Sequence, residues 1–150
     1  MSKSSPIPEP SIASDLAAQI RTTLSRLKRR LREHGARQDL TPSQISVLLR
    51  LESDGPATVS GLARAEAMRP QSMSSIVTSL QQTGLVNSSS DPSDGRQTLI
   101  SLSKKCQKLL RESRAARQDW LTAVILQKLS PHEQQQLSRS LELLNRIAED

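Results

Sequence analysis

The run from Thr58 to Leu102 constrains the fold most, because it combines helical and strand patterns in a fixed order. It predicts a short helix, a tight turn, a second helix that starts at Pro70, and two strands. The strands are joined by Asp91-Pro92-Ser93-Asp94-Gly95-Arg96. That order is a helix-turn-helix followed by a β-hairpin, the outline of a winged helix. The chain is therefore predicted to be mainly α (α+β).

The second of these helices, from Pro70 to Thr83, carries no charged side chain. Its apolar residues recur at helical spacing and predict a buried face, made of Met73, Ile76, Val77 and Leu80. The opposite face is polar and consists of Gln71, Ser72, Ser74, Ser75, Thr78, Ser79, Gln81 and Gln82. A helix without carboxylates can enter a DNA groove without repelling the phosphates. The alternative is an ordinary solvated helix face.

The residues nearest the start of this helix are those that a recognition helix usually sets against base edges. Glutamine can bind the N6 and N7 edge of adenine, and serine and threonine can bind bases or phosphates. Arg69 stands just before the helix and can reach a guanine or a phosphate. We therefore predict DNA contacts from Arg69, Gln71, Ser72, Ser74, Ser75 and Thr78.

The loop between the two strands is a second, independent indication of DNA binding. Gly95 is expected to let the backbone turn where a side chain would clash. Arg96 follows it at a projecting tip, and a guanidinium there can lie in a narrow minor groove. Asp91 or Asp94 is expected to hold Arg96 through a bidentate pair. The alternative is a surface turn with a weak, screened ion pair.

The charge distribution tempers this interpretation. The 150 residues carry a net charge of +6, which favours a polyanionic partner but also suits a well-dispersed protein. From Thr58 to Leu102, three arginines are balanced by three acids: Arg64, Arg69 and Arg96 against Glu66, Asp91 and Asp94. The basic excess lies in the first long helix and after the hairpin. There Lys104 and Lys105 directly follow the second strand, and we predict that they contact phosphates.

The segments before the winged region are predicted to be an arm and two helices. Residues 1–13 are rich in Ser and Pro and are expected to form a flexible arm. A long amphipathic helix follows from Ser14 to His34, and Gly35 is expected to end it in a left-handed conformation. Thr41-Pro42-Ser43-Gln44 is a capping-box start for the next helix. Its buried face is expected to be Ile45, Leu48, Leu49 and Leu51.

Two more helices are predicted after the hairpin, one from Ser103 to about Lys128 and one that begins at Ser130-Pro131. The apolar stripes at both ends of the chain must be covered, and a symmetric mate would cover them. We therefore expect residues 14–150 to form a single domain, with 14–36 and 103–150 as dimerisation helices and 41–102 as the winged helix-turn-helix. The alternative is a monomer whose terminal helices pack together.

The ordered set of motifs resembles the MarR family of winged-helix transcriptional regulators. The resemblance rests on Leu40-Thr41-Pro42-Ser43-Gln44, Val59-Ser60-Gly61-Leu62-Ala63, Met68-Arg69-Pro70-Gln71-Ser72-Met73, Gly84-Leu85-Val86 and the Asp91–Arg96 loop. It implies a homodimer in which Gln71, Ser72, Ser74 and Ser75 meet the major groove and Arg96 the minor groove. Three positions depart from the family's pattern. They are Gly61, Cys106 and Asn87, which opens Asn87-Ser88-Ser89-Ser90 where a basic residue is common.

The resemblance also implies a repressor released by a small anionic or aromatic effector, bound between the dimer helices and the winged lobe. With one Trp, no Phe and no Tyr, such a pocket would be mostly aliphatic, with an arginine as anchor. The expected partner is a pseudo-palindromic operator in double-stranded DNA. The rival interpretation is a winged-helix protein-interaction module that does not read DNA, and the neutral charge count and the Ser-rich hairpin motivate it.

Several classes of site are not expected. Two histidines and one cysteine do not make a zinc site, and no set of catalytic side chains can be identified, so neither a metal, nor a cofactor, nor an enzyme is predicted. Cys106 is interpreted as an inert, partly buried thiol, with oxidant sensing as the weaker alternative. No signal peptide or membrane span is seen, so a cytoplasmic location is expected by default.

Overall fold

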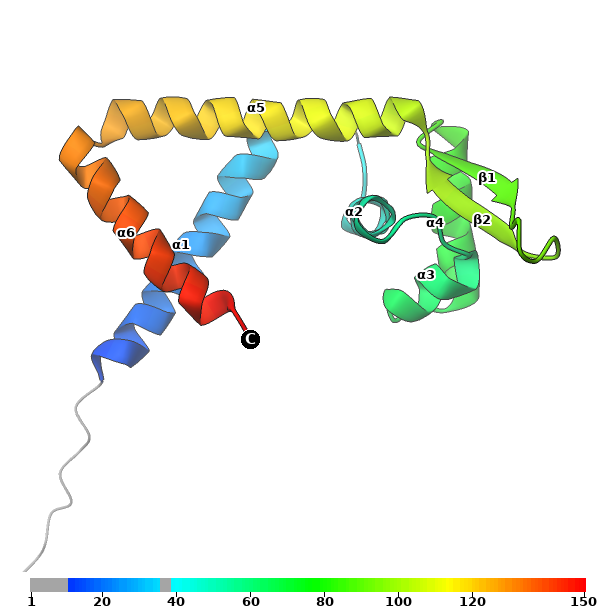
Figure 1. The fold of residues 1–150 in the computed structure, drawn as a ribbon, viewed down its shortest axis with the longest axis horizontal. Coiled ribbons are helices and arrows are strands. Elements are labelled where there is room, and N and C mark those ends of the chain that lie inside the picture. The colour runs from blue at the N-terminus through cyan, green and yellow to red at the C-terminus, as the bar shows by residue number, and fades with distance from the viewer. Residues whose placement is uncertain (1–10, 36–38) are drawn as a thin grey trace, which may run out of the picture. The chain divides into compact units, whose positions relative to one another are not determined.

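The computed structural model describes residues 11–35 and 39–150, and the chain divides into two compact units (Figure 1). One unit comprises residues 36–118 and the other comprises residues 1–35 and 119–150. The elements in chain order are α1 (Ile12–His34), α2 (Pro42–Asp54), α3 (Val59–Ala65), α4 (Pro70–Gln82), β1 (Val86–Ser90), β2 (Thr98–Leu102), α5 (Lys104–Lys128) and α6 (Pro131–Ala148). The mainly helical winged fold is therefore confirmed.

The unit of residues 36–118 is the winged helix. Strands β1 and β2 form an antiparallel hairpin in which Val86 pairs with Leu102 and Ser90 with Thr98. The segment before α3 joins this hairpin through a bridge between Ala57 and Ile100. Helices α2, α3 and α4 pack with the hairpin around one apolar core, which contains Val47, Leu48, Leu51, Leu62, Ala63, Met73, Val77, Leu80, Leu85, Val86, Ile100 and Cys106. This core fixes which face of α4 remains outside.

Local capping explains where the helices of the winged unit begin. Thr41 and Gln44 form the expected capping box at the start of α2. Thr58 caps α3, because its Oγ1 accepts a hydrogen bond of 3.0 Å from the backbone N–H of Gly61. A Cβ at position 61 would lie 3.1 Å from that same Oγ1. The tight cap therefore accounts for a glycine inside a short helix.

Glycines end two of the helices as expected, but not the first. Gly55 after α2 and Gly84 after α4 have φ of 84° and 73°, a region that favours glycine. Gly35 was predicted to adopt the same left-handed conformation after α1. Its backbone is instead extended, with φ −78° and ψ 165°, so that prediction is wrong.

Three further expectations need correction. Helix α1 begins at Ile12 because the Ser11 hydroxyl accepts from the backbone N–H of Ser14, so residues 11–13 do not belong to an arm. The remaining arm residues lie outside the described part of the chain. In α2, Val47 is fully buried, whereas Ile45 and Leu49 are 40% and 48% exposed. The core-facing stripe of α2 is therefore rotated from the predicted one.

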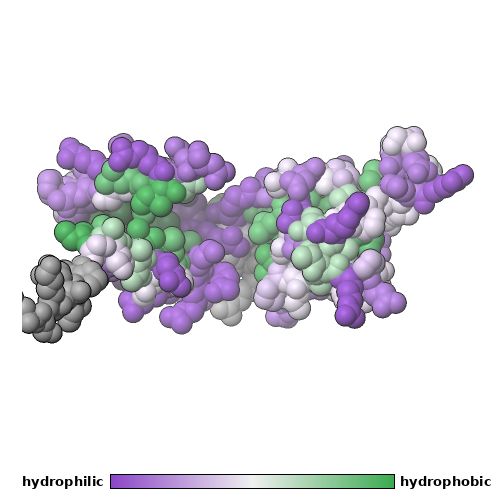
Figure 2. All heavy atoms as spheres, turned by 90° about the horizontal axis from the view of Figure 1, so that it is seen from below, coloured by the Kyte–Doolittle hydropathy of each residue, from purple (hydrophilic) through white to green (hydrophobic). Residues whose placement is uncertain are grey.

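The other unit contains α1, the end of α5 and α6. Neither α1 nor α6 contains a buried residue. The Trp120 ring stacks on the His34 ring at 4.4 Å, and the Arg30 guanidinium lies 5.4 Å from its centroid. Figure 2 shows apolar side chains at the surface of this unit. Across residues 11–35 and 39–150, no helix has the length and apolar character needed to cross a membrane.

Candidate nucleic-acid interface

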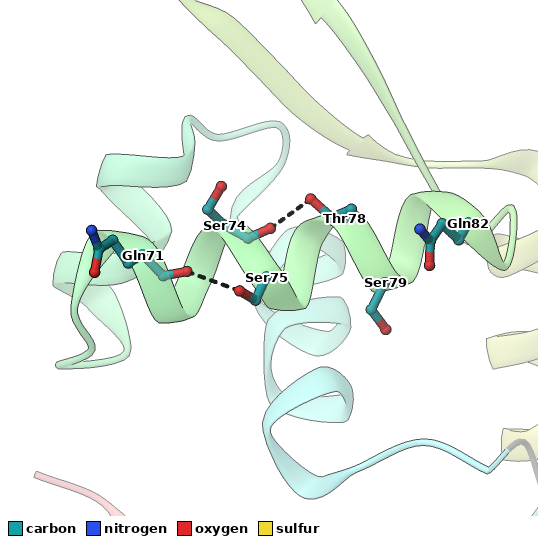
Figure 3. Close-up of a pocket in the computed structure, with 6 residues that line it drawn as sticks. All are labelled: Gln71, Ser74, Ser75, Thr78, Ser79 and Gln82. Carbon is teal, nitrogen blue, oxygen red and sulfur yellow. Dashed lines mark hydrogen bonds between the residues drawn. The ribbon is translucent and has the colours of Figure 1, made fainter.

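The outer face of α4 is the centre of the candidate interface. Met73, Val77 and Leu80 point into the core, which turns the polar residues of the helix outward. A shallow hollow of about 410 Å³ follows this face and is lined by Gln71, Ser74, Ser75, Thr78, Ser79 and Gln82 (Figure 3). Four residues predicted to contact DNA thus share one surface. Ser72 is also exposed on α4 but does not line the hollow.

Two hydroxyl groups on this face are engaged by the helix itself. Ser75 Oγ donates to the carbonyl oxygen of Gln71 at 3.2 Å, and Thr78 Oγ1 donates to that of Ser74 at 2.9 Å (Figure 3). A carbonyl oxygen can only accept, so the hydroxyl hydrogens of Ser75 and Thr78 are both directed at the backbone. What these two side chains offer to a ligand is therefore oxygen lone pairs.

The far half of α4 is tied to neighbouring elements. The side-chain amide of Gln44, which also closes the cap of α2, donates to Ser79 Oγ. The Gln81 amide donates to Ser88 Oγ on β1 at 2.9 Å. Both Ser79 and Gln81 were predicted to belong to the open polar face. The structure uses them instead to hold α4 against α2 and the hairpin.

The turn before α4 is fastened by an ion pair that sequence reasoning missed. Glu66 Oε1 accepts from Arg50 Nε at 2.7 Å, and its Oε2 accepts from the Ser46 hydroxyl at 2.8 Å. These bonds lower the pKa of the Glu66 carboxyl and raise the pKa of the Arg50 guanidinium. The next residue, Ala67, has a φ of +51°. The pair therefore secures a turn with an unfavourable backbone conformation.

Sequence offered little signal for this clamp, because Arg50 and Ser46 lie 16 and 20 residues before Glu66. Glu66 had been counted as a free acid within a neutral reading unit. Its side chain is only 15% exposed and its charge is paired with an arginine outside that unit. The neutral count consequently overstates the negative charge that α3 and α4 present.

The hairpin loop is braced, but not in the expected way. Asp91 Oδ1 accepts from both the backbone N–H and the hydroxyl of Ser93, at 2.9 and 2.8 Å, which lowers the pKa of the Asp91 carboxyl. Asp94 Oδ1 accepts from the backbone N–H of Arg96 at 3.1 Å. Among the described residues, no ion pair joins the Arg96 guanidinium to either carboxylate. The predicted bidentate pair is wrong, and the exposed guanidinium remains available.

Gly95 also differs from expectation. Its φ is not positive, and a Cβ built on it would meet nothing within 4 Å. The predicted clash that would require glycine at this position does not exist. Of the wing-support residues, Asp91 and Asp94 therefore shape the loop through their hydrogen bonds, while Gly95 has no such role.

The two lysines after the hairpin are in different situations. Lys104 is exposed, and no hydrogen bond or ion pair engages its ammonium group in the described residues. Lys105 Nζ donates to the carbonyl oxygen of Thr83, the residue after α4, at 3.0 Å. Ser103 Oγ donates to the neighbouring carbonyl oxygen of Gly84 at 2.7 Å. The start of α5 thus grips the end of α4, a contact that the sequence did not reveal.

The remaining chemistry of the winged unit is sparse. Cys106 is fully buried, and burial, together with the nearby Glu52 carboxylate, raises the pKa of its thiol. This supports the inert interpretation over oxidant sensing. A second hollow of about 280 Å³ is lined by Leu51, Glu52, Gly55, Pro56, Ser101, Leu102 and Gln107. It presents a carboxylate and no arginine, so it does not match the pocket expected for an anionic effector.

Comparisons with known proteins agree with this architecture. A family model described as the MarR family matches residues 40–98. HTH-type transcriptional regulators from Mycobacterium leprae and Mycobacterium tuberculosis are 38% identical over 106 residues, 71% of this chain and 74% of theirs. The crystal structure of a Pseudomonas aeruginosa transcriptional regulator superposes with a TM-score of 0.76 at 32% identity, covering 89% of this chain and 94% of that one.

A third relative is informative for the fold. The Staphylococcus aureus MepR F27L mutant, whose structure was solved bound to an oligodeoxyribonucleotide, superposes with a TM-score of 0.71. The match covers 89% of this chain and 98% of that one at 19% identity, so it establishes the shared fold. The same arrangement of three helices and a hairpin is thus found in solved regulators.

Proposed function

Because the chain belongs to the MarR family of winged-helix transcriptional regulators, we propose that it represses transcription as a homodimer bound to double-stranded DNA. In this proposal α4 enters the major groove and the hairpin wing reaches the minor groove. The observation that carries it is the outer face of α4, where polar, uncharged side chains line one open surface. The MepR structure with an oligodeoxyribonucleotide lends support from a protein of the same fold.

The DNA contacts that we propose come from both ends of the reading unit. On α4 they are Gln71, Ser72, Ser74, Ser75 and Thr78, with Arg69 just before the helix. Arg96 on the wing and Lys104 at the start of α5 supply positive charge for the backbone. Lys105 remains in the proposal with less support, since its ammonium group already serves Thr83.

The proposal of a homodimer rests on the surface of the unit that contains α1 and α6. Leu16 and Leu24 on α1 are 51% and 52% exposed, and Leu141 and Ile147 on α6 are 48% and 72% exposed. Apolar side chains recurring along two helices without a buried residue call for a partner. A second copy related by two-fold symmetry buries both stripes at once and supplies a second reading head, so the bound site is a pseudo-palindrome.

Release by a small anionic or aromatic effector completes the proposal and rests on family membership alone. The rival idea of a protein-interaction module that does not read DNA is not favoured, because the curated relatives are HTH-type transcriptional regulators. The family assignment likewise identifies a regulator and not an enzyme.

The central experiment is a fluorescence-anisotropy titration of the full chain against its own upstream DNA and against a shuffled duplex of equal length. We expect one dimer per duplex, tighter binding to the upstream DNA, and two half-sites about 10 bp apart. With 6–10 phosphates contacted, affinity should fall roughly 10³–10⁵-fold between 50 and 200 mM salt. Equal, weak binding to both duplexes would remove the claim of sequence specificity.

Two further measurements address the finer points. Light scattering after size exclusion should give twice the 16.5 kDa chain mass, and a monomer at micromolar concentration would overturn the dimer. Titrating benzoate into the protein–DNA complex should lower the anisotropy if an aromatic acid releases the DNA. A reporter gene placed behind the bound site separates repression from activation.

A further inference from the structure

The hydrogen bonds on the outer face of α4 restrict what that face can recognise. Ser75 and Thr78 both donate their hydroxyl hydrogens to carbonyl oxygens one turn earlier, at 3.2 and 2.9 Å. A hydroxyl group has one hydrogen and two lone pairs, so each side chain is left as an acceptor only. Polarisation by the donated bond makes each oxygen a somewhat better acceptor. Both oxygens line the same hollow (Figure 3).

The major groove offers acceptors and donors in a pattern that differs between bases. Adenine presents the N6 amino group and cytosine the N4 amino group, while guanine O6 and N7 and thymine O4 are acceptors. Each base pair therefore has its amino group on one strand. An acceptor-only side chain distinguishes adenine or cytosine from guanine or thymine on the strand that it faces.

We propose that Ser75 and Thr78 are specificity-determining residues that select an amino-bearing base, adenine or cytosine, at the positions they face in the major groove. The inference rests on the proposed function, because it needs α4 to enter that groove. Placing a guanine or thymine there sets lone pairs against lone pairs unless the bond to the helix carbonyl is broken. Phosphate oxygens are also acceptors, so these two residues are unsuited to backbone contacts.

The neighbouring side chains give the proposal its contrast. The Gln71 amide carries both donors and acceptors and can bind adenine in bidentate fashion. Ser74 is exposed on the same surface, and its hydroxyl hydrogen is not directed at a helix carbonyl in the bonds that the described residues form. We therefore expect a base preference limited to A or C opposite Ser75 and Thr78, and a different rule opposite Gln71.

The test begins with selection of bound sequences from a random-sequence duplex library, using the full chain and its Thr78→Val and Ser75→Ala variants. Valine keeps the shape of threonine but loses the acceptor. Thr83→Val and Ser140→Ala are the matched controls, because the Thr83 and Ser140 hydroxyls also donate to carbonyls of their own helices yet lie off the α4 hollow. Melting temperatures confirm that all four variants fold.

The wild type should select A or C at one position per half-site that Thr78→Val relaxes, and at a neighbouring position that Ser75→Ala relaxes. At these positions, replacing adenine by purine, or cytosine by 2-pyrimidinone, removes the amino group. That change should weaken wild-type binding about 5-fold, the loss expected for one hydrogen bond. The matching variant should show no further loss, and the controls should behave as wild type.

Different failures point to different conclusions. If the wild type selects a site but each variant keeps its full A-or-C preference, or the relaxed positions carry G or T, the acceptor rule is overturned while sequence-specific binding stands. If amino-group removal and the variants weaken binding additively, the hydroxyls do not contact those bases, and the rule again fails. If the wild type selects no sequence at all, the proposed function falls and this inference falls with it.

Discussion

Lys105 Nζ donates a 3.0 Å hydrogen bond to the carbonyl oxygen of Thr83, so the start of α5 is fastened to the end of the candidate recognition helix. Carbonyl groups at the end of a helix lack partners within the helix, and a lysine ammonium supplies one. Ser103 adds a second bond, to the carbonyl oxygen of Gly84. These two contacts make α5 a support for α4, whatever α5 does elsewhere.

This relationship predicts different behaviour for two adjacent lysines. Lys105→Met should lower the free energy of unfolding by about 0.5–1.5 kcal/mol and weaken DNA binding without changing its salt dependence. Lys104→Met should leave stability unchanged and reduce the slope of log affinity against log salt by about 0.9, the value for one lost phosphate contact. Urea unfolding and salt titrations of anisotropy measure both effects. A reduced slope in Lys105→Met would show that Lys105 contacts phosphate after all.

The clamp at Glu66 predicts a second stability effect. Glu66→Gln keeps the shape of the side chain but removes the charge that Arg50 faces in a partly shielded site, and should cost about 1–2 kcal/mol. Asp54→Asn is the matched control, because Asp54 lies 3.6 Å from the same guanidinium but is 60% exposed, and it should cost less than about 0.5 kcal/mol. Equal losses in the two variants would contradict the special role of Glu66.

The same carboxyl group makes stability depend on pH. Its pKa is lowered in the folded chain, mainly by the Arg50 bond and then by the Ser46 bond. Its contribution is therefore complete above the unfolded pKa, about 4.3, and is lost as pH falls through the lower folded value. The stability difference between wild type and Glu66→Gln should be constant from pH 7 to about 5 and shrink below about 4. Urea unfolding at pH 7, 5, 4 and 3 checks this, and a difference that grows toward pH 3 would reverse the assignment.

Two glycines at the borders of the hairpin should respond oppositely to alanine. Gly84 has a φ of +73°, so Gly84→Ala should cost about 1–2 kcal/mol through backbone strain. Gly95 has no positive φ and open space around it, so Gly95→Ala should change stability by less than about 0.5 kcal/mol and leave DNA affinity intact. Thermal unfolding and anisotropy provide both readouts. Loss of DNA binding in Gly95→Ala would restore a role for that glycine.

Arg96 is the wing residue whose guanidinium has no carboxylate partner among the described residues. Arg96→Ala should weaken operator binding about 10-fold or more while leaving dimerisation intact, because a minor-groove guanidinium is lost. Arg139→Ala on α6 removes the same charge from the other unit and should leave affinity near that of wild type. If the two variants bind alike, only net charge matters and the minor-groove contact has to be abandoned.

The elements were predictable where the signal is local. Thr41 with Gln44 and Ser130 with Glu133 are capping boxes that can be recognised within four residues, and both start helices as expected. The buried stripe of α4 followed from its spacing, and the strands were placed to within one residue. Gly35 and Gly95 were misjudged because a glycine's conformation depends on what surrounds it, which spacing does not contain.

The sequence by itself determined the order of helices and strands, the polar character of the outer face of α4, and the family, since caps, periodicity and motifs act over a few residues. Only the tertiary structure decided which polar groups remain free on that face. Gln44 reaches Ser79 across 35 residues, Arg50 reaches Glu66 across 16, and Lys105 reaches Thr83 across 22. Such pairings depend on how the helices pack around the common core, and no local pattern encodes which distant side chains the packing brings within hydrogen-bonding distance.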